Sequence, residues 1–309
     1  MTIGKFGRNY RLILLDNLTA NTGLELRNDK GAQSLTIDFD IQRGVGADLN
    51  SMSLKIYNLS RENQAQLFQA RLDLSNKNTF TARPIILQAG YNNGLSVIFR
   101  GGIKEAFTFR QGQDLITQIE ALDGILGTIQ TYANISYESA ATAQQIVDDL
   151  VSPLTSNQTE IDKGQTKLST QTSALIGNNQ RGYVICGNAY DILQQYTQQK
   201  AFIDLGELNI LSDNECIRPS VRVIDAEAGL LGVPRLDGLR VTIETIFEPR
   251  VNVGEFIEVQ SNVAKQFNGQ YKVAAVQHKG MLSDTIAGNA ISIFQLYGGD
   301  VADNLVTIN

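Results

Sequence analysis

Alternation of apolar and polar residues over short runs predicts that most of this chain forms β-strands. The clearest run is RVTIETIF at 240–247. Successive side chains of a strand point to opposite faces, so this run indicates a strand with one buried face. The residues predicted to point inward are Val241, Ile243, Thr245 and Phe247, and those predicted to point outward are Arg240, Thr242 and Glu244. The run LTIDFDI at 35–41 alternates in the same way and places Asp38 and Asp40 on its outer side.

A set of three strand-like runs occurs twice in the chain. The first set is PIILQAGY (84–91), VIFRGGIKEAFTF (97–109) and DLITQIEAL (114–122), and the second is EFIEVQS (255–261), FNGQYKVAAVQHK (267–279) and NAISIFQLY (289–297). Few residues are identical, but strand lengths and turn positions agree. A repeat at this spacing predicts two related β domains rather than a solenoid, whose units are shorter and more numerous. Chance agreement between two all-β segments is the alternative.

The pattern changes between the two sets. Apolar residues at helical spacing predict a helix over 139–151, with Ser139 as its N-cap, and a second helix over 189–196. Residues 152–182 are dense in Ser, Thr, Gln and Asn and predict a long exposed loop. Phe202 to Leu211 predicts a hairpin that turns at Gly206.

Two short stretches between the N-terminal strands also have recognisable patterns. RGVGAD at 43–48 predicts a flexible loop, and Ser60 is expected to cap a short helix that ends near Phe68. Together these patterns predict a mainly β chain with an α+β insertion. Two similar β-barrel domains, at 1–124 and 226–309, would flank a small α/β domain at 125–225 that contains the polar loop 152–182.

Composition narrows the range of functions. The chain has 32 acidic and 26 basic residues and a net charge of −6. Tight nucleic-acid binding relies on Lys and Arg that neutralise phosphates, so this balance argues against it. Cys186 and Cys216 are too few for a disulfide framework and are expected to be free, buried thiols. The N-terminal residues lack the apolar core of a signal peptide, and no apolar run approaches the ~20 residues of a membrane helix, so synthesis in the cytoplasm is expected.

Residues with catalytic potential form no recognised motif. His278 is the single histidine of the chain and is expected to be a structural residue at a strand end. The patterns of a serine nucleophile elbow and of a phosphate-binding loop are absent from the sequence. Asp38 and Asp40 would lie about 7 Å apart on one strand face. A glycosidase could use such a pair, an acidic channel could be lined by it, or the face could simply be solvated. No catalytic residue, metal ligand or cofactor is predicted.

Six stretches of the chain resemble the tail hub and baseplate proteins of bacteriophages, a family related to the hubs of contractile tails and to the hub part of type VI secretion spikes. The stretches are LTIDFDIQR…NSMSLKIYNLS (35–60), RPIILQAGY…IFRGGI (83–103), ITQIEALDG (116–124), RGYVICGNAYDILQQ (181–195), AGLLGVPRLDGLRVTIETIFEPRVNVGEFIEVQS (228–261) and YKVAAVQHKG (271–280). The resemblance implies a homotrimer in which each subunit contributes two similar β barrels, so that three chains form a ring of six.

A member of this family would be a structural hub of the virion, assembled in the host bacterial cytoplasm. The resemblance implies that it joins the tail tube protein to the central spike protein, contacts other baseplate proteins, and encloses a channel for DNA and the tape-measure protein. The candidates for channel-lining charge are Asp38, Asp40, Glu244 and Glu258. Carboxylates in such a channel would repel phosphates, so DNA would pass without specific binding. A tail-associated cell-wall hydrolase and a receptor-binding tail protein are the alternatives.

Overall fold

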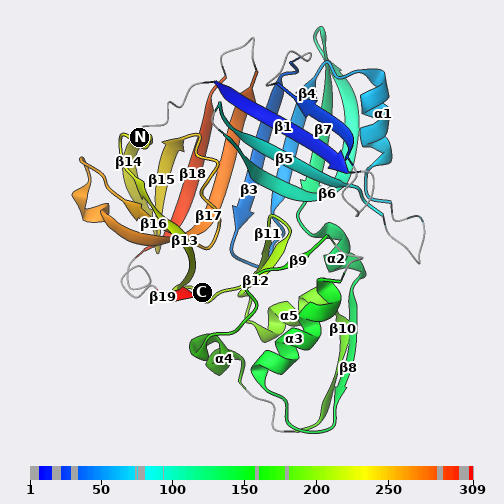
Figure 1. Cartoon of the computed structure of the whole chain (residues 1–309), viewed down its shortest axis with the longest axis vertical. Coiled ribbons are helices and arrows are strands. Elements are labelled where there is room, and N and C mark those ends of the chain that lie inside the picture. The colour runs from blue at the N-terminus through cyan, green and yellow to red at the C-terminus, as the bar shows by residue number, and fades with distance from the viewer. Residues whose placement is uncertain are drawn as a thin grey trace.

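One large antiparallel β-sheet dominates the computed structural model (Figure 1). The structure describes residues 7–15, 22–28, 34–73, 75, 81–92, 94–156, 160–177, 181–283, 288–298 and 306–308. The strand order along the main path of this sheet is β14-β15-β18-β17-β3-β4-β7-β6-β5-β1-β2. The path therefore runs from strands of the C-terminal part to strands of the N-terminal part without a break.

The N-terminal part supplies seven strands and a short helix. Its elements are β1 (Arg8–Leu15), β2 (Thr22–Arg27), β3 (Ile37–Gly44), β4 (Ser51–Tyr57), α1 (Arg61–Gln69), β5 (Pro84–Tyr91), β6 (Gly94–Gln111) and β7 (Asp114–Leu122). As predicted, Ser60 caps α1, because its side chain accepts a hydrogen bond from the backbone N–H of Asn63. Ile37, Phe39 and Ile41 alternate inward along β3 and are buried in the core of this part.

The C-terminal part contains the remaining long strands. Its elements are β13 (Glu215–Ile224), β14 (Leu230–Asp237), β15 (Arg240–Ile246), β16 (Glu255–Val259), the 3-10 helix η1 (Lys265–Phe267), β17 (Gly269–Leu282), β18 (Ala290–Tyr297) and β19 (Val306–Ile308). The inward and outward faces predicted for residues 240–247 are confirmed, since Val241, Ile243, Thr245 and Phe247 are all buried. Off the main path, β13 pairs with β16 and β19, and β16 pairs with β17.

The middle of the chain forms a small α/β unit below the sheet (Figure 1). Its elements are α2 (Ile125–Gln130), β8 (Tyr132–Tyr137), α3 (Ala143–Leu154), β9 (Asp162–Lys163), α4 (Thr170–Ile176), β10 (Tyr183–Asn188), α5 (Ala189–Tyr196), β11 (Ala201–Asp204) and β12 (Glu207–Ile210). The predicted hairpin is confirmed: Gly206 turns between β11 and β12 with a φ of 83°. Helices α3 and α5 bury their apolar faces against each other and against β8 and β10.

Three local predictions for this region and for 43–48 were wrong. Helix α3 begins after Thr142 and not at Ser139, because the Thr142 side chain accepts a hydrogen bond from the N–H of Gln145. The tract 152–182 is not one exposed loop, since the last turn of α3, β9 and α4 lie in it; its residues 157–159 and 178–180 are outside the described part. Arg43 is not in a flexible loop, because β3 continues to Gly44 and the side chain of Arg43 is fully buried.

The cysteine prediction holds in part. Both thiols are free, and Cys216 is buried, but Cys186 is exposed on β10. The Tyr132 hydroxyl lies 3.3 Å from the Cys186 sulfur.

The two predicted repeats have the same strand pairing. β5 pairs with β6 and β6 with β7, just as β16 pairs with β17 and β17 with β18. Both long strands, β6 and β17, change partner half-way along their length. The register shift on β6 falls between Ile103 and Glu105, and that on β17 falls between Val273 and Ala275. These positions coincide in the sequence alignment of the repeats, so the irregularity itself is repeated.

The repeat also extends to the strands that precede each set. β3, β4, β7 and β6 are consecutive neighbours in the sheet, and so are β14, β15, β18 and β17. The fold class is therefore confirmed: the chain is mainly β, with two similar β units and an α/β segment between them. The structure adds that the two units share one sheet, because β17 pairs with β3 from Ala275–Gly44 to Leu282–Ile37. The domain limits stay predictions, and the pairing of β13 with β16 favours a limit before Glu215.

Candidate functional site

A band of polar side chains crosses the face of the shared sheet that points away from the cores. Residues in register on neighbouring strands point to the same side, so the pairings identify the members of this band. We call it the polar face: Asp38, Asp40 and Gln42 of β3; Ser51, Ser53 and Lys55 of β4; Gln118 and Glu120 of β7; Gln277 and Lys279 of β17; and Thr242 and Glu244 of β15. Between β17 and β15, β18 contributes Gln295 and the apolar Ile291 and Ile293 to the same face. Three of the four candidate residues, Asp38, Asp40 and Glu244, therefore lie on one face.

The fourth candidate lies elsewhere. Glu258 is on β16, which belongs to the branch of the sheet formed with β13, and it is opposite Val223 and Gln270. Its carboxylate accepts a hydrogen bond of 2.7 Å from the Gln260 amide. The structure thus separates Glu258 from the other three candidates.

Hydrogen bonds hold the carboxylates of the polar face in place. The Gln277 amide donates to Asp40 at 2.8 Å, which links β17 to β3 across the junction of the two units. The Ser53 hydroxyl and the Gln118 amide donate to Glu120 at 2.8 and 2.7 Å. All three donors are neutral groups, so these bonds orient the carboxylates without adding a positive charge.

The charge on this face is mixed, with an acidic excess. Lys55 is in register with Asp38, and Lys279 is in register with Asp40. Glu120 and Glu244 have no basic residue in register on the neighbouring strands. Burial, together with the negative charge of Asp38, raises the pKa of Tyr57 at the end of β4. The face would repel polyanions weakly rather than bind them.

A shallow hollow of about 160 Å³ opens on the same face at the junction of the units. Its lining residues are Gln42, Arg43, Ala275, Val276, Gln277, Ile293 and Gln295. Beneath it, Arg43 donates two hydrogen bonds to Asp204 at 2.7 and 2.6 Å and one to Asn252 at 3.0 Å. The junction of the two β units is thus anchored to the middle segment by a buried ion pair.

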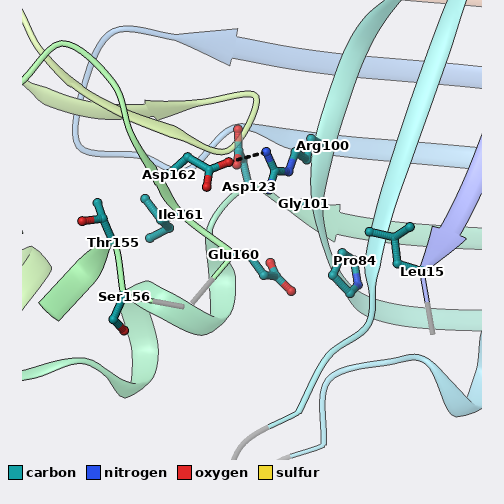
Figure 2. A pocket seen from close by; sticks show the side chains of 10 residues that line it. All are labelled: Leu15, Pro84, Arg100, Gly101, Asp123, Thr155, Ser156, Glu160, Ile161 and Asp162. Atoms are coloured by element: carbon teal, nitrogen blue, oxygen red, sulfur yellow. Dashed lines mark hydrogen bonds and ion pairs between the residues drawn. The ribbon is translucent and has the colours of Figure 1, made fainter. Parts of the chain in front are cut away.

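A second pocket lies between β5, β6 and the middle segment, and Figure 2 shows the side chains around it. Arg100 donates to Asp162 at 2.7 Å on one side of the pocket. Glu160 is 5% exposed, and neither oxygen of its carboxyl group has a hydrogen-bond partner within the described part of the chain. Asp123 is also buried and accepts hydrogen bonds from the N–H of Gly206.

The acidic residues of this pocket are not grouped as metal ligands, and burial shifts the pKa of some of them. Among the described residues, no group of three or more His, Cys, Asp or Glu side chains could hold a metal ion. Burial raises the pKa of Asp123 well above its usual value, and the nearby charge of Asp204 adds to this effect. Burial therefore favours the neutral form of two carboxyl groups in this pocket, those of Asp123 and Glu160.

The comparison with protein families identifies the family of the chain. The sequence profile of the family described as baseplate hub gp41 matches residues 19–281. The chain belongs to this baseplate hub family. Membership places the hub protein among the structural components of phage tails and baseplates, and hence of the virion. A search of curated proteins returns no match.

Solved structures similar to the hub protein come from phage tails and a secretion system. The 43 kDa tail protein of prophage MuSo2 from Shewanella oneidensis has a TM-score of 0.57 at 10% identity, over 98% of this chain and 100% of that chain. The tail protein from Neisseria meningitidis MC58 has a TM-score of 0.53 at 10% identity, with the same coverage. The E. coli c3393 protein, a type VI secretion component described as similar to T4 tail proteins gp27 and gp5, has a TM-score of 0.51 at 10% identity over 88% and 76%. At such low identity these structures show the fold alone.

The single histidine of the hub protein is buried inside β17 and not at a strand end as predicted. His278 is fully buried in β17, and its Nδ1 atom lies 2.8 Å from the Ser292 hydroxyl. Its ring contacts Phe247 and Phe294 edge to face. Burial lowers the pKa of His278 to about 3, and the charge of Arg43 acts in the same direction, so the ring stays neutral. No helix among the described residues is long and apolar enough to span a membrane.

Sequence reasoning missed the buried charged groups. Arg43 and Asp204 are 161 residues apart in the chain, and no local pattern links them. Glu160 lies within a tract whose composition predicts solvent exposure. The only available signal for Arg43 was its place in the alternation of β3, where an inward position holds a charged residue.

Glu160 leads to a prediction about pH. Burial raises its pKa from 4.5 to about 8, against a smaller opposite effect of Arg100. A carboxyl group with a higher pKa in the folded chain lowers the free energy of unfolding progressively as the pH rises from about 4.5 to about 8. Glu160→Gln cannot ionise, so the variant should be more stable than the parent by about 2 kcal/mol or more at pH 8 and similar to it at pH 4.5.

Urea unfolding at the two pH values measures this difference. Asp162→Asn is the matched control, because Asp162 is 64% exposed and pairs with Arg100 at the surface. Its effect should stay below about 1 kcal/mol at both pH values. An equal effect of Glu160→Gln at both pH values would show that Glu160 is ionised in the folded chain.

Proposed function

We propose that this hub protein forms a homotrimeric ring that joins the tail tube to the central spike and encloses the channel for DNA and the tape-measure protein. The observation that carries the proposal is the duplicated four-strand unit. β14, β15, β18 and β17 repeat the arrangement of β3, β4, β7 and β6, and the two units stand side by side in one sheet. Three such chains supply six similar units.

Symmetry explains why this arrangement suits an adaptor. A closed ring of three identical chains presents threefold symmetry, whereas six similar units present a near-sixfold surface. The ring could therefore meet a sixfold tube on one side and a threefold spike on the other. The tube protein, the spike protein and other baseplate proteins are the proposed partners.

The polar face is the proposed wall of the channel. It is continuous across the junction of the units, it is hydrogen-bonded in place, and its charge has an acidic excess. DNA would pass such a wall without binding to it, because carboxylates repel phosphates. Asp38, Asp40 and Glu244 are proposed to line the channel, and Glu258 is proposed to lie outside it.

Light scattering tests the ring directly. The purified protein should have a mass about three times that of the 33.9 kDa chain. A protein that remains monomeric at micromolar concentration, also when mixed with its tube and spike partners, would refute the proposal.

Reversal of charge tests the wall. The triple variant Asp38→Lys, Asp40→Lys, Glu244→Lys should bind short double-stranded DNA at low salt. Its affinity for the DNA should fall steeply with added salt. The control carries the same change at Glu62, Asp191 and Glu227, three exposed acidic residues away from the polar face. Equal DNA retention by both variants would show that the polar face is an ordinary solvent-exposed surface.

The hub is proposed to act without catalysis. Its family consists of structural tail and baseplate proteins, and the pocket of Figure 2 contains carboxyl groups that burial keeps neutral. Release of soluble sugars from purified peptidoglycan by the protein, and its loss in Asp38→Asn, Asp40→Asn, would favour a hydrolase instead.

A further inference from the structure

We propose that neighbouring copies of this chain are joined by strand pairing: β14 of one copy adds to residues 105–111 of β6 in the next copy. The inference rests on the proposed ring and names the two edges that close it. Each of these strand edges is proposed to pair with the other edge on a second copy of the same chain.

The template for this contact is present within the chain. Where the two β units meet, the second half of β17 pairs with β3, in antiparallel register from Ala275–Gly44 to Leu282–Ile37. This pairing joins the long strand of one unit to the first strand of the other. In a ring of such units, every junction would have to join a long strand to a first strand.

The partners of the missing junction follow from the repeat. β6 is the counterpart of β17, because both are the long strands with a register shift at the same aligned position. β14 is the counterpart of β3, because each is the first of four neighbouring strands in its unit. The contact equivalent to β17–β3 is therefore β6–β14, and within one chain these two strands do not pair.

Both edges are open in the part of the chain that the structure describes. β14 has β15 as its one strand partner, and it ends the main path of the sheet. Residues 105–111 of β6 pair with β7 on one side, while β5 pairs only with the first half of β6, up to Gly102. Figure 1 shows β14 at the left of the sheet and β6 at the right, so one chain cannot join them.

The second half of β17, which is paired with β3, is more buried than the second half of β6, which has an open edge. His278 of β17, next to β3, is fully buried, whereas Thr108 at the aligned position of β6 is exposed. The same strand half is thus covered where its edge is paired and open where it is not.

Apolar side chains gather at the two open edges. Phe107 on β6 is 40% exposed, and on β14 the exposed fractions are 36% for Leu231, 56% for Val233 and 54% for Leu236. An open strand edge with exposed apolar side chains is a site for pairing with another strand. A contact between two different edges of identical chains is head-to-tail, and it closes into a ring when the rotation allows.

The template also gives the register. In the chain, His278 lies opposite Ile41, and Ile41 lies opposite Met52. Thr108 aligns with His278. In the aligned runs 114–122 and 289–297, Ala121 matches Leu296. Met52 lies opposite Ala121 and Val241 opposite Leu296, so Val241 corresponds to Met52. Leu236 lies opposite Val241 and therefore corresponds to Ile41. Thr108 of one copy is therefore expected opposite Leu236 of the next.

Cysteine cross-linking tests this register. The double variant Thr108→Cys, Leu236→Cys is made with Cys186→Ser, because Cys186 is exposed and would otherwise react. Paired residues on adjacent antiparallel strands have Cβ atoms close enough for a disulfide. Mild oxidation should convert most of the protein into covalent trimers on a non-reducing gel. Each single cysteine variant should stay uncross-linked, as should Thr108→Cys combined with Val263→Cys, since Val263 is 77% exposed and off both edges.

The result is read together with the mass of the protein before oxidation. A trimer whose Thr108–Leu236 pair does not cross-link overturns the inference and leaves the ring intact. Linear chains of disulfide-linked subunits without closed trimers support the edge contact and refute a ring of three. A monomer that forms no cross-link overturns both.

Discussion

Replacing Arg43 by alanine should destabilise the chain by about 3–5 kcal/mol, because it leaves the buried Asp204 carboxylate without its cation. The Arg43 side chain is 0% exposed and donates two hydrogen bonds to Asp204, which is 7% exposed. Asn50 also donates to Asp204, at 2.8 Å. Asp123 lies close enough for Arg43 to lower its pKa. Without Arg43, the Asp204 carboxylate would have no ion-pair partner among the described residues.

Equilibrium unfolding in urea at pH 7 measures this loss. The control is Arg100→Ala, which removes an ion pair between side chains that are 34% and 64% exposed and should change the free energy of unfolding by less than about 1 kcal/mol. The destabilisation by Arg43→Ala should shrink toward pH 4. Protonation removes the charge of a buried carboxylate that has lost its cation, so the cost of leaving it unpaired falls with the pH. An effect as small as that of Arg100→Ala would mean that solvent reaches Asp204.

Replacing Phe247 by alanine should cost about 3–5 kcal/mol, the range found for removal of a large buried aromatic side chain. Phe247 directly follows β15, and its side chain is 0% exposed. Its ring lies 5.9 Å from that of Phe39, 6.3 Å from that of Tyr91 and 5.5 Å from that of His278. Two of these neighbours belong to the N-terminal unit, so the substitution removes packing between the two β units.

The measurement is thermal and urea unfolding, followed both by circular dichroism and by tyrosine fluorescence. The control is Phe68→Ala on α1, where the ring is 50% exposed, and its effect should be below about 1 kcal/mol. Since Phe247 packs in the core of the other unit, the two probes should report one shared transition in the parent protein. Separate transitions for the two units in the parent would show that the shared sheet does not couple them.

The β elements were predictable from sequence because their signals are local. Alternation of side chains along 35–41 and 240–247 gave both the strands and their buried faces. Ser60 and Gly206 marked a helix start and a hairpin turn by chemistry that depends only on the adjacent backbone. The aligned register shifts of β6 and β17 confirm that comparison of the two strand sets carries structural information even where few residues are identical.

What could not be predicted depends on contacts between distant residues. Helix α4 lies in a polar tract because Thr172 is buried by hydrogen bonds, to Ser212 at 2.7 Å and to Glu215 at 3.1 Å. Such satisfied polar groups have no signature in hydropathy. The N-cap of α3 was misplaced because both Ser139 and Thr142 have the required hydroxyl, and residue type alone does not choose between them. The pairing of β17 with β3 joins residues more than 200 positions apart, and no sequence period encodes it.

The fusion of two β units in one polypeptide has a consequence for assembly kinetics. Of the six junctions in the proposed ring, the three of the β17–β3 type form within a chain, at the effective concentration that a covalent link provides, typically in the millimolar range. Only the other three require diffusional encounter. Formation of the proposed ring would then depend on about the third power of the chain concentration instead of the sixth.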